Sequence, residues 1–298
     1  MPKENNDIGD DHMAYQFLRF PGGKAKAVTL SYDDSTKDDI RFLDTINAYK
    51  LKCTFNLVSN WIGREAHTDK EFIKEHILKS GHEIANHGFN HKALDSVRVL
   101  DGIQDTLNSR LCLERDFGVI VRGMAYPCRV INRFAKPEVY RQIKSYLQDL
   151  DIVYARSVGS DNDKFELPED WHCWVPTAHH SNPKVLEFID KFLALDVSKL
   201  TTPNRQPRLF YLWGHSYEFE RKNNWELIDE MCEKLAGKDD TWYATNIEIY
   251  DYVQAYNSLV YSADGTIIYN PTLYTIWFAI DGKSYSIKSG ETLHLQDA

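Results

Sequence analysis

Short runs of β-favouring residues alternate with longer amphipathic stretches along most of the chain. The short runs lie at residues 26–33, 53–57, 82–86, 119–125, 151–155, 172–175, 208–213 and 241–244. Apolar residues recur at helical spacing in the segments 36–50, 71–80, 94–118, 137–150 and 182–195. A strand followed by a helix, repeated seven or eight times, predicts a parallel sheet. Such an α/β sheet closes most economically as a (β/α) barrel.

The pattern changes after about residue 258. Two Asp-Gly pairs, Asp264-Gly265 and Asp281-Gly282, lie between β-rich runs, and this dipeptide between such runs indicates a hairpin. We therefore expect a barrel over residues 14–257 and a small β domain over 258–298. Residues 1–13 are polar and acidic without periodicity, which predicts a disordered tail.

Net charge and cysteine usage narrow the classes of function. The 298 residues include 35 Lys and Arg against 44 Asp and Glu, which gives a formal net charge of −9. This charge repels phosphate backbones and anionic lipid, so we expect neither nucleic acid nor a membrane as a partner. The five cysteines form no CxxC pair, which argues against a zinc ribbon and a dense disulfide framework.

The start of the chain gives an expectation about location. It has no cationic stretch followed by an apolar one, and no window approaches the roughly 18 apolar residues of a membrane span. We therefore expect a cytoplasmic protein. A secreted protein whose signal peptide had been removed would have the same sequence.

Two adjacent aspartates end the first predicted barrel strand. Asp33 and Asp34 follow KAVTLSY, and reactive groups in a β/α barrel lie where strands end. Neighbouring carboxylates repel each other, unless one binds a cation and the other holds or accepts a proton. The alternative is a helix N-cap formed by Asp34, Ser35 or Asp38. Taken alone, these residues favour the cap.

A histidine pair follows the third predicted strand. GHEIANHGFNH places His87 and His91 four residues apart, a spacing that aims two imidazoles at one point on a helical turn. Most such pairs are simply exposed or packed histidines. Together with Asp34, however, they would provide three mixed oxygen and nitrogen ligands and leave the open positions that a catalytic metal needs.

A third candidate lies where LFYLWGH ends in Gly214 and His215. A histidine at this rim can titrate near neutral pH and donate a proton to a leaving group. The alternative is a hydrogen-bonded histidine that caps the strand.

The order SYDD, HGFNH, AYP and GHS resembles the polysaccharide deacetylase family, also called the NodB homology domain or carbohydrate esterase family four. The resemblance spans about residues 25–250 and implies a distorted (β/α) barrel of seven or eight strands. It implies that Asp33 is the general base and that Asp34, His87 and His91 are metal ligands. It also implies that His215 is the catalytic acid, although LWGH has one residue more than the family's leucine-x-histidine motif.

The third family motif is incomplete in VRGMAYPCRV. If Pro127 matches the family proline, the backbone amide of Cys128 would hold the oxyanion. The family arginine position then falls on Ala125, and we expect Arg122 to reach the base instead. Tyr126 is expected to contact the substrate.

The fourth motif, an aspartate followed by tryptophan, is similar to Asp170-Trp171. By this resemblance, Asp170 would hold His215 in its working tautomer. Trp171 and Trp174 either wall a sugar pocket or are buried in the core. His179 and His180 have no assigned role, and we expect them in a surface loop.

These residues predict a metal-dependent hydrolase that removes acetyl groups from N-acetylated or O-acetylated carbohydrate. We expect Zn²⁺ as the metal, while Co²⁺, Fe²⁺ or Mn²⁺ would suit the same ligands. Two alternatives stay open. One is a sugar-binding barrel without turnover, suggested by the missing arginine, and the other is a metal hydrolase of a small cytosolic amide. The oligomeric state does not follow from the sequence.

Overall fold

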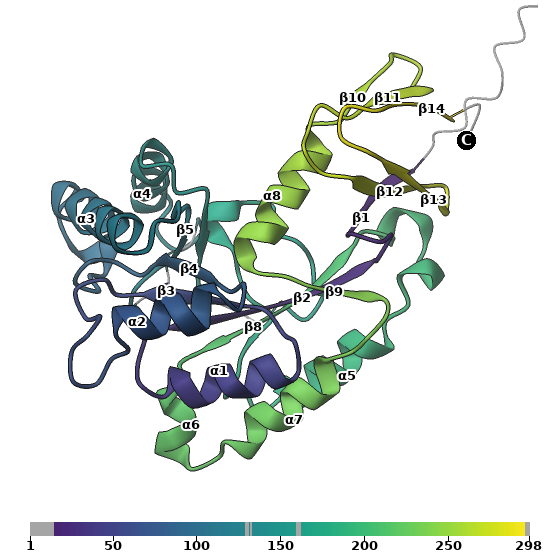
Figure 1. The fold of residues 1–298 in the computed structure, drawn as a ribbon. Helices are drawn as coiled ribbons and strands as arrows, with labels where there is room; N and C mark the ends of the chain where they lie inside the picture. Colours follow the sequence, from purple (N-terminus) through teal and green to yellow (C-terminus); the bar gives the residue numbers. More distant parts are fainter. Residues whose placement is uncertain (1–14, 129–130, 132, 159–161, 296–298) are drawn as a thin grey trace, which may run out of the picture.

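The computed structural model describes residues 15–128, 131, 133–158 and 162–295 (Figure 1). The tail predicted over residues 1–13 lies outside these ranges. In the part of the chain that is described, no helix is long and apolar enough to cross a membrane.

A curled parallel sheet forms the centre of the molecule. Across the described residues its path contains β6 (Tyr154–Arg156), β5 (Gly123–Ala125), β4 (Glu83–Asn86), β3 (Cys53–Leu57), β2 (Lys26–Asp33), β8 (Arg208–Gly214) and β7 (Ala178–His179). The short strand β9 (Thr241–Tyr243) pairs with the start of β2. The predicted α/β class and the distorted barrel are confirmed.

Helices connect the strands and cover the sheet. Their bounds are α1 (Asp39–Ala48), α2 (Lys70–Phe72), α3 (Val99–Phe117), α4 (Pro137–Asp149), α5 (Val185–Ala194), α6 (Tyr217–Lys222), α7 (Glu226–Leu235) and α8 (Asn246–Asn257). A π-helical turn, Ile73–Leu78, continues α2. Helix α7 contacts both α1 and α5, and Figure 1 shows these three helices along one side of the sheet.

One predicted strand is wrong. Residues 172–175 were expected to be extended, but Trp171–Cys173 form a 3₁₀ turn and the next strand, β7, begins only at Ala178. The backbone of Trp174 bridges to Arg156 at the end of β6, and β7 pairs with β8. This irregular segment therefore spans the side of the barrel between β6 and β8.

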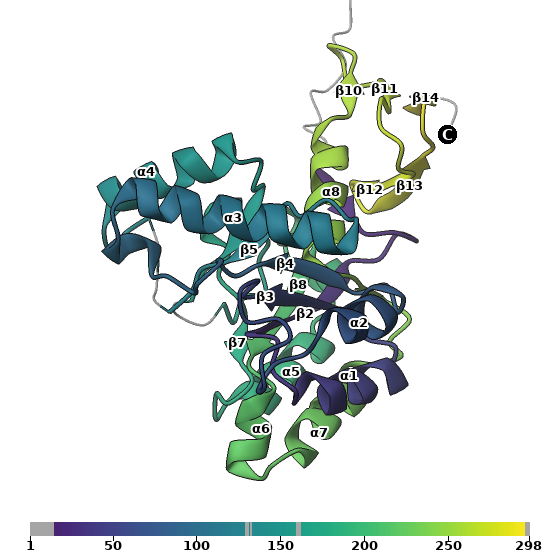
Figure 2. The ribbon, with the colours of Figure 1, turned by 60° about the vertical axis from the view of Figure 1, so that its left-hand side comes forward.

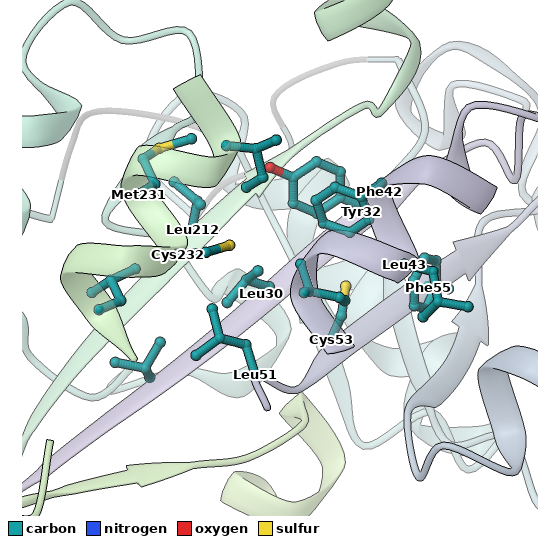
Figure 3. Packing of buried hydrophobic residues seen from close by; sticks show 14 of the residues in the cluster. Leu30, Tyr32, Phe42, Leu43, Leu51, Cys53, Phe55, Leu212, Met231 and Cys232 are labelled. Atoms are coloured by element: carbon teal, nitrogen blue, oxygen red, sulfur yellow. The ribbon is translucent and has the colours of Figure 1, made fainter. Parts of the chain in front are cut away.

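Strand β2 shows how the sequence positions the site. Leu30 and Tyr32 pack into the core beneath the helices (Figure 3). Because side chains alternate along a strand, Ser31 and Asp33 face the opposite, inner side of the curled sheet. There both accept hydrogen bonds from the Asn56 side chain of β3. An all-buried central strand therefore carries an apolar face toward the helices and a polar face inward.

Two small antiparallel sheets stand beside the barrel (Figure 2). The first sheet has the order β1 (Gln16–Arg19), β12 (Ile276–Ile280) and β13 (Lys283–Ile287). The second has the order β10 (Val260–Tyr261), β11 (Ile267–Tyr269) and β14 (Thr292–His294). Asp281 and Gly282 join β12 to β13 with positive φ at both positions, as a tight hairpin turn requires. Strand β1 lies in the segment expected to belong to the barrel, but it pairs with β12 of the region expected to be a separate C-terminal β domain.

A buried histidine ties β3 to the π-helical turn and α1. His82 accepts the backbone N–H of Cys53 at Nδ1 (3.1 Å), which leaves Nε2 to donate to Asn47 Oδ1 at 2.9 Å. Burial, with a smaller effect of Lys52, lowers the pKa of His82 to about 4. Since an unfolded histidine titrates near 6.5, the unfolded chain binds a proton that folded His82 does not bind between these values.

We therefore expect His82 to make the protein sensitive to mild acid. Its contribution to the free energy of unfolding is complete above pH 6.5 and falls by about 2 kcal/mol by pH 5. Urea unfolding at pH 7.5 and pH 5 should show a smaller difference between the two pH values for His82→Gln than for the wild type. An equal difference in both proteins would contradict this assignment.

Candidate active site

The turn after β2 sends the two aspartates in different directions. Asp34 and Ser35 both have positive φ, 77° and 52°, a region that L-residues rarely adopt. A neighbouring loop holds the turn: Ser35 O accepts the Thr68 backbone N–H at 2.9 Å, and His67 Nδ1 lies 3.0 Å from Asp34 O. Strained backbone of this kind concentrates at functional sites, so the turn marks the end of β2 as a candidate site.

Asp33 is 2% exposed, and both of its carboxylate oxygens are engaged. Oδ1 accepts from Asn56 Nδ2 at 2.8 Å, and Oδ2 accepts from Arg156 Nη2 at 2.5 Å. Arg156 is the last residue of β6 and is itself buried. Burial raises the pKa of Asp33, but Arg156, His87 and His215 lower it further, so that it lies below its usual range. The carboxylate therefore stays ionised.

Asp34, His87 and His91 converge on one point. His87 Nε2 and His91 Nε2 lie 3.2 Å apart. Asp34 Oδ1 lies 3.7 Å from His87 Nε2 and 3.5 Å from His91 Nε2. Two ligand atoms that each bind a tetrahedral ion at about 2.1 Å are about 3.4 Å apart. Asp34, which precedes both histidines by more than fifty residues in the sequence, therefore forms with them a set that has the spacing of metal ligands.

The hydrogen bonds of these residues also fit a metal. Asp34 Oδ1 is buried and has no hydrogen-bond partner among the residues that the structure describes, which is costly unless a cation or another donor meets it. His87 donates from Nδ1 to Ala125 O at 2.9 Å, and its Nε2 therefore keeps a lone pair. Burial, and next His87, lower the pKa of His91, which favours the neutral imidazole that binds metals.

The two aspartates are distinguished by their partners and not by their distances. Asp33 Oδ2 lies 3.8 Å from His87 Nε2, almost as close as Asp34 Oδ1. The oxygens of Asp33, however, are already bound by Asn56 and Arg156, whereas Asp34 Oδ1 is unpartnered. Asp34 also does not cap α1, because the N-cap is Asp38, without a side-chain capping bond. The arrangement leaves Asp34 as the carboxylate available to a cation.

A loop, and not a helical turn, brings the two histidines together. The loop reverses direction at Gly88 and His91, which have φ of 80° and 56°. Asp105 of α3 accepts the backbone N–H groups of Phe89 and Asn90 at 3.0 Å each. A Cβ at Gly88 would lie 2.6 Å from Asp105 Oδ2, so this position requires glycine. The four-residue spacing therefore identified the pair although the expected helical geometry was wrong.

His215 follows β8, and its ring lies beside both aspartates. Its Nε2 is 3.9 Å from Asp33 Oδ2 and 3.9 Å from Asp34 Oδ2, while its Nδ1 lies 2.8 Å from Glu218 Oε1. Burial lowers the pKa of His215, but the hydrogen bond to Glu218 and the charges of the aspartates raise it above its ordinary value. An imidazole that keeps its proton in this position can act as a general acid.

Asp170 does not reach His215, so the role predicted for it is wrong. Its Oδ2 accepts from Tyr140 Oη at 2.7 Å and from Lys144 Nζ at 2.9 Å, and its Oδ1 caps the 3₁₀ turn at His172. Glu218 takes the place beside the histidine. It lies three positions after His215, a spacing that on a helical turn brings two side chains together.

Arg122 does not reach Asp33, and this prediction is also wrong. It lies at the start of β5, at the opposite end of the strand from the site, and pairs with Asp251 of α8 at 2.5 Å. Arg156 pairs with Asp33 instead. Its position directly at the end of β6 is the signal that could have identified it. Reactive groups in a β/α barrel lie where strands end, and this rule also identified Asp33.

Of the three aromatic residues expected to bind substrate, Tyr126 and Trp174 are buried in the core and Trp171 is partly buried against it. Tyr126 is buried and donates from Oη to His172 O at 2.8 Å. Trp174 is 1% exposed, and Trp171 packs edge-on against it and against Tyr250. Aromatic rings beside the site belong to other residues: Trp213 lies beneath the Arg156 guanidinium, and Trp61 packs against the His91 ring.

Two further expectations concern the surroundings of the site. His179 and His180 are not in a surface loop, because His179 belongs to β7 and His180 is 1% exposed. Cys128 lies beside the histidine loop, with Sγ 3.4 Å from both Nδ1 and O of His91. Its φ is 66°, so its backbone is turned sharply next to the metal ligands.

Comparisons with known proteins agree with this geometry. Residues 21–145 match the family model described as polysaccharide deacetylase, which confirms the family resemblance over that segment. A search of the curated proteins finds no match.

Solved structures share the fold. A Mycobacterium smegmatis protein provisionally described as a polysaccharide deacetylase superposes with a TM-score of 0.55 at 19% identity, covering 80% of this chain and 94% of its own. Puue allantoinase superposes with a TM-score of 0.55 at 13% identity, covering 78% of this chain and 91% of its own. Such likeness establishes the distorted barrel for this chain.

We expect metal content to separate the two aspartates. Replacing a ligand should weaken metal binding by more than the roughly 10- to 100-fold that loss of an outer partner costs, so Asp34→Ala and His91→Ala should lose the metal. Asp33→Asn should keep it. Elemental analysis after Zn²⁺ loading and dialysis measures the difference, and equal metal loss in the two aspartate variants would contradict the assignment.

Proposed function

We propose that this chain, whose residues 21–145 match the polysaccharide deacetylase family, is a metal-dependent hydrolase that removes acetyl groups from N-acetylated or O-acetylated carbohydrate. The observation that carries the proposal is the convergence of a three-residue ligand set, an ionised buried carboxylate and a protonatable histidine on one point. Together these groups can hold a cation, accept a proton and donate a proton, which are the requirements of acyl hydrolysis.

Asp33 is the general base. Its carboxylate is held ionised by Arg156 and faces the ligand set, so it can take a proton as a water oxygen attacks the acyl carbon. Because Asn56 and Arg156 fix both oxygens, the carboxylate needs little reorganisation before it accepts that proton.

His215 is the general acid. When the bond between the acyl carbon and the leaving nitrogen or oxygen breaks, Nε2–H of His215 gives its proton to the leaving group. The products are acetate and the free amine or alcohol. In each turnover Asp33 gains one proton and His215 loses one. Because Oδ2 and Nε2 lie 3.9 Å apart, beyond the roughly 2.6–3.2 Å of direct transfer, the two groups are reset through water.

Asp34, His87 and His91 would hold a divalent ion, with Zn²⁺ our first expectation. When bound, such an ion polarises an acyl carbonyl and lowers the pKa of water from about 15.7 towards about 7. The backbone N–H of Cys128, turned beside His91, is the proposed additional donor to the oxyanion, and loss of one such donor typically costs about 3 kcal/mol of barrier.

The direct test is hydrolysis by the wild-type protein. We expect acetate to be released from acetylated chito-oligosaccharides and from a small acetyl ester, a chelator to abolish release, and Zn²⁺ to restore it. Sugar binding without acetate in a single turnover of the Zn²⁺-loaded protein would instead support a binding protein. Release of formate or ammonia from small amides, without deacetylation, would support the small-amide alternative.

The pH dependence tests the role of Arg156. Without the guanidinium, the largest of the interactions that offset burial is lost, and the pKa of Asp33 rises. The base is active only when ionised, so for Arg156→Met the loss of kcat/KM on the acid side should begin at higher pH. Arg156→Lys keeps the charge and should shift the profile less. An acid limb at the same pH in all three proteins would refute this role.

A further inference from the structure

Glu218 is the centre of a cluster on the side of His215 that faces away from the aspartates. Its Oε1 lies 2.8 Å from His215 Nδ1 and 3.2 Å from His179 Nε2, and its Oε2 lies 3.5 Å from His180 Nε2. Ser181 Oγ donates to Oε2 at 3.2 Å, and Lys222 Nζ lies 3.3 Å from the same atom. The carboxylate is thus surrounded by donors from β7, β8 and its own helix.

These donors keep Glu218 charged. Burial raises its pKa, but the interactions with His179, His180 and His215 lower it far more, so that its pKa lies far below the ordinary range. A carboxylate fixed by several donors presents its oxygens in fixed directions. It can therefore set the orientation of the one donor that also faces the substrate, His215.

The partner of His179 Nδ1 determines which ring nitrogen carries the proton. The backbone N–H of Ser181 donates to His179 Nδ1 at 3.1 Å, so Nδ1 has a free lone pair and the proton of the neutral ring is on Nε2. That N–H points at Glu218. His179 is therefore a donor to the carboxylate.

His180 reaches the same tautomer from the other side. Its Nδ1 lies 3.2 Å from the Tyr32 hydroxyl, and burial lowers the pKa of His180 to about 4, which leaves the ring neutral. With the Tyr32 hydroxyl as donor to Nδ1, the ring proton lies on Nε2. This nitrogen is 3.5 Å from Glu218 Oε2 and makes no hydrogen bond among the described residues, so its contact with Glu218 is electrostatic. The ring also stacks on Phe219, so its position is fixed by packing as well.

Gly214 makes room for this arrangement. A Cβ at residue 214 would lie 2.0 Å from His180 Nδ1, and no other residue could stand there without displacing the ring. Gly214 is in the LWGH segment that is one residue longer than the family motif. The insertion and the histidine pair therefore belong to one local structure, which has Glu218 beside the catalytic histidine where we had expected Asp170.

His179, His180 and Glu218 also have the spacing of a metal site, but their protons oppose that use. A metal ligand needs a lone pair on the nitrogen that faces the ion, whereas His179 accepts the Ser181 N–H at Nδ1 and so carries its ring proton on Nε2, the atom that faces Glu218. The cluster is organised to donate hydrogen bonds to Glu218 and not to bind a cation.

We propose that Glu218, held by His179 and His180, is the positioning residue that holds His215 as a proton donor to strongly basic leaving groups. The inference rests on the proposed function and names its leaving-group class: the amine of an N-acetyl sugar or the alkoxide of a sugar ester. These groups cannot depart without a proton, whereas a para-nitrophenolate can. The cluster acts through His215 and does not itself contact the reacting atoms.

The test compares leaving groups. In Glu218→Gln and His180→Phe, kcat/KM for acetylated chito-oligosaccharide should fall about 100-fold, while para-nitrophenyl acetate should change by less than about 3-fold. The phenylalanine retains the stacking on Phe219 and removes both polar contacts. Arg221→Gln is the matched control on α6, because Arg221 contacts only the Tyr217 ring among the interactions described, and it should leave both rates unchanged.

Equal losses of kcat/KM on both substrates would overturn the proposal. Binding of a second equivalent of Zn²⁺ by the wild type, lost in His180→Phe, would also overturn it. Imidazole ¹⁵N spectra provide a readout that needs no substrate: His215 should carry its hydrogen-bonded proton on Nδ1 in the wild type and lose that signal in Glu218→Gln. If the wild type hydrolyses neither substrate, the proposed function fails, and the spectra still decide whether Glu218 orients His215.

Discussion

A carboxylate that is 2% exposed keeps its charge only if a cation stays beside it, and in this protein that cation is Arg156. The bond between them crosses the inner face of the sheet, from the end of β6 to the end of β2. Arg156 is itself restrained, because Trp213 lies against its guanidinium 4.2 Å away. The pair breaks the equivalence of two adjacent aspartates: Asp33 is fully engaged, and Asp34 is left with an unpartnered oxygen for a cation.

Much of the site could be predicted from residue order. Strand ends identified Asp33, Asp34 and His215, because a parallel barrel brings its carboxyl ends together whatever the sequence distance between them. The residues that orient these groups were harder to find. Arg156 follows a weak strand pattern far from any motif. Glu218 lies three positions after His215, a spacing visible in the sequence, but the family resemblance pointed to Asp170.

The errors share a physical cause. Trp171, Trp174 and Tyr126 have the composition of a sugar-binding wall and also that of a core, and only packing decides between the two. The segment around Trp174 has the apolar pattern of a strand but turns in a 3₁₀ conformation, because Asp170 caps the turn and Trp174 then bridges to β6. Local pattern does not encode such long-range partners.

The pairing of β1 with β12 has a consequence for how the molecule is made. Gln16 lies opposite Ile280, so an emerging polypeptide must hold β1 without its partner until residue 280 has left the ribosome. Contacts between such distant segments are slow to form, since a long loop must be closed first. The barrel strands can assemble earlier, and the pairing of β1 with β12 is then a late step in folding.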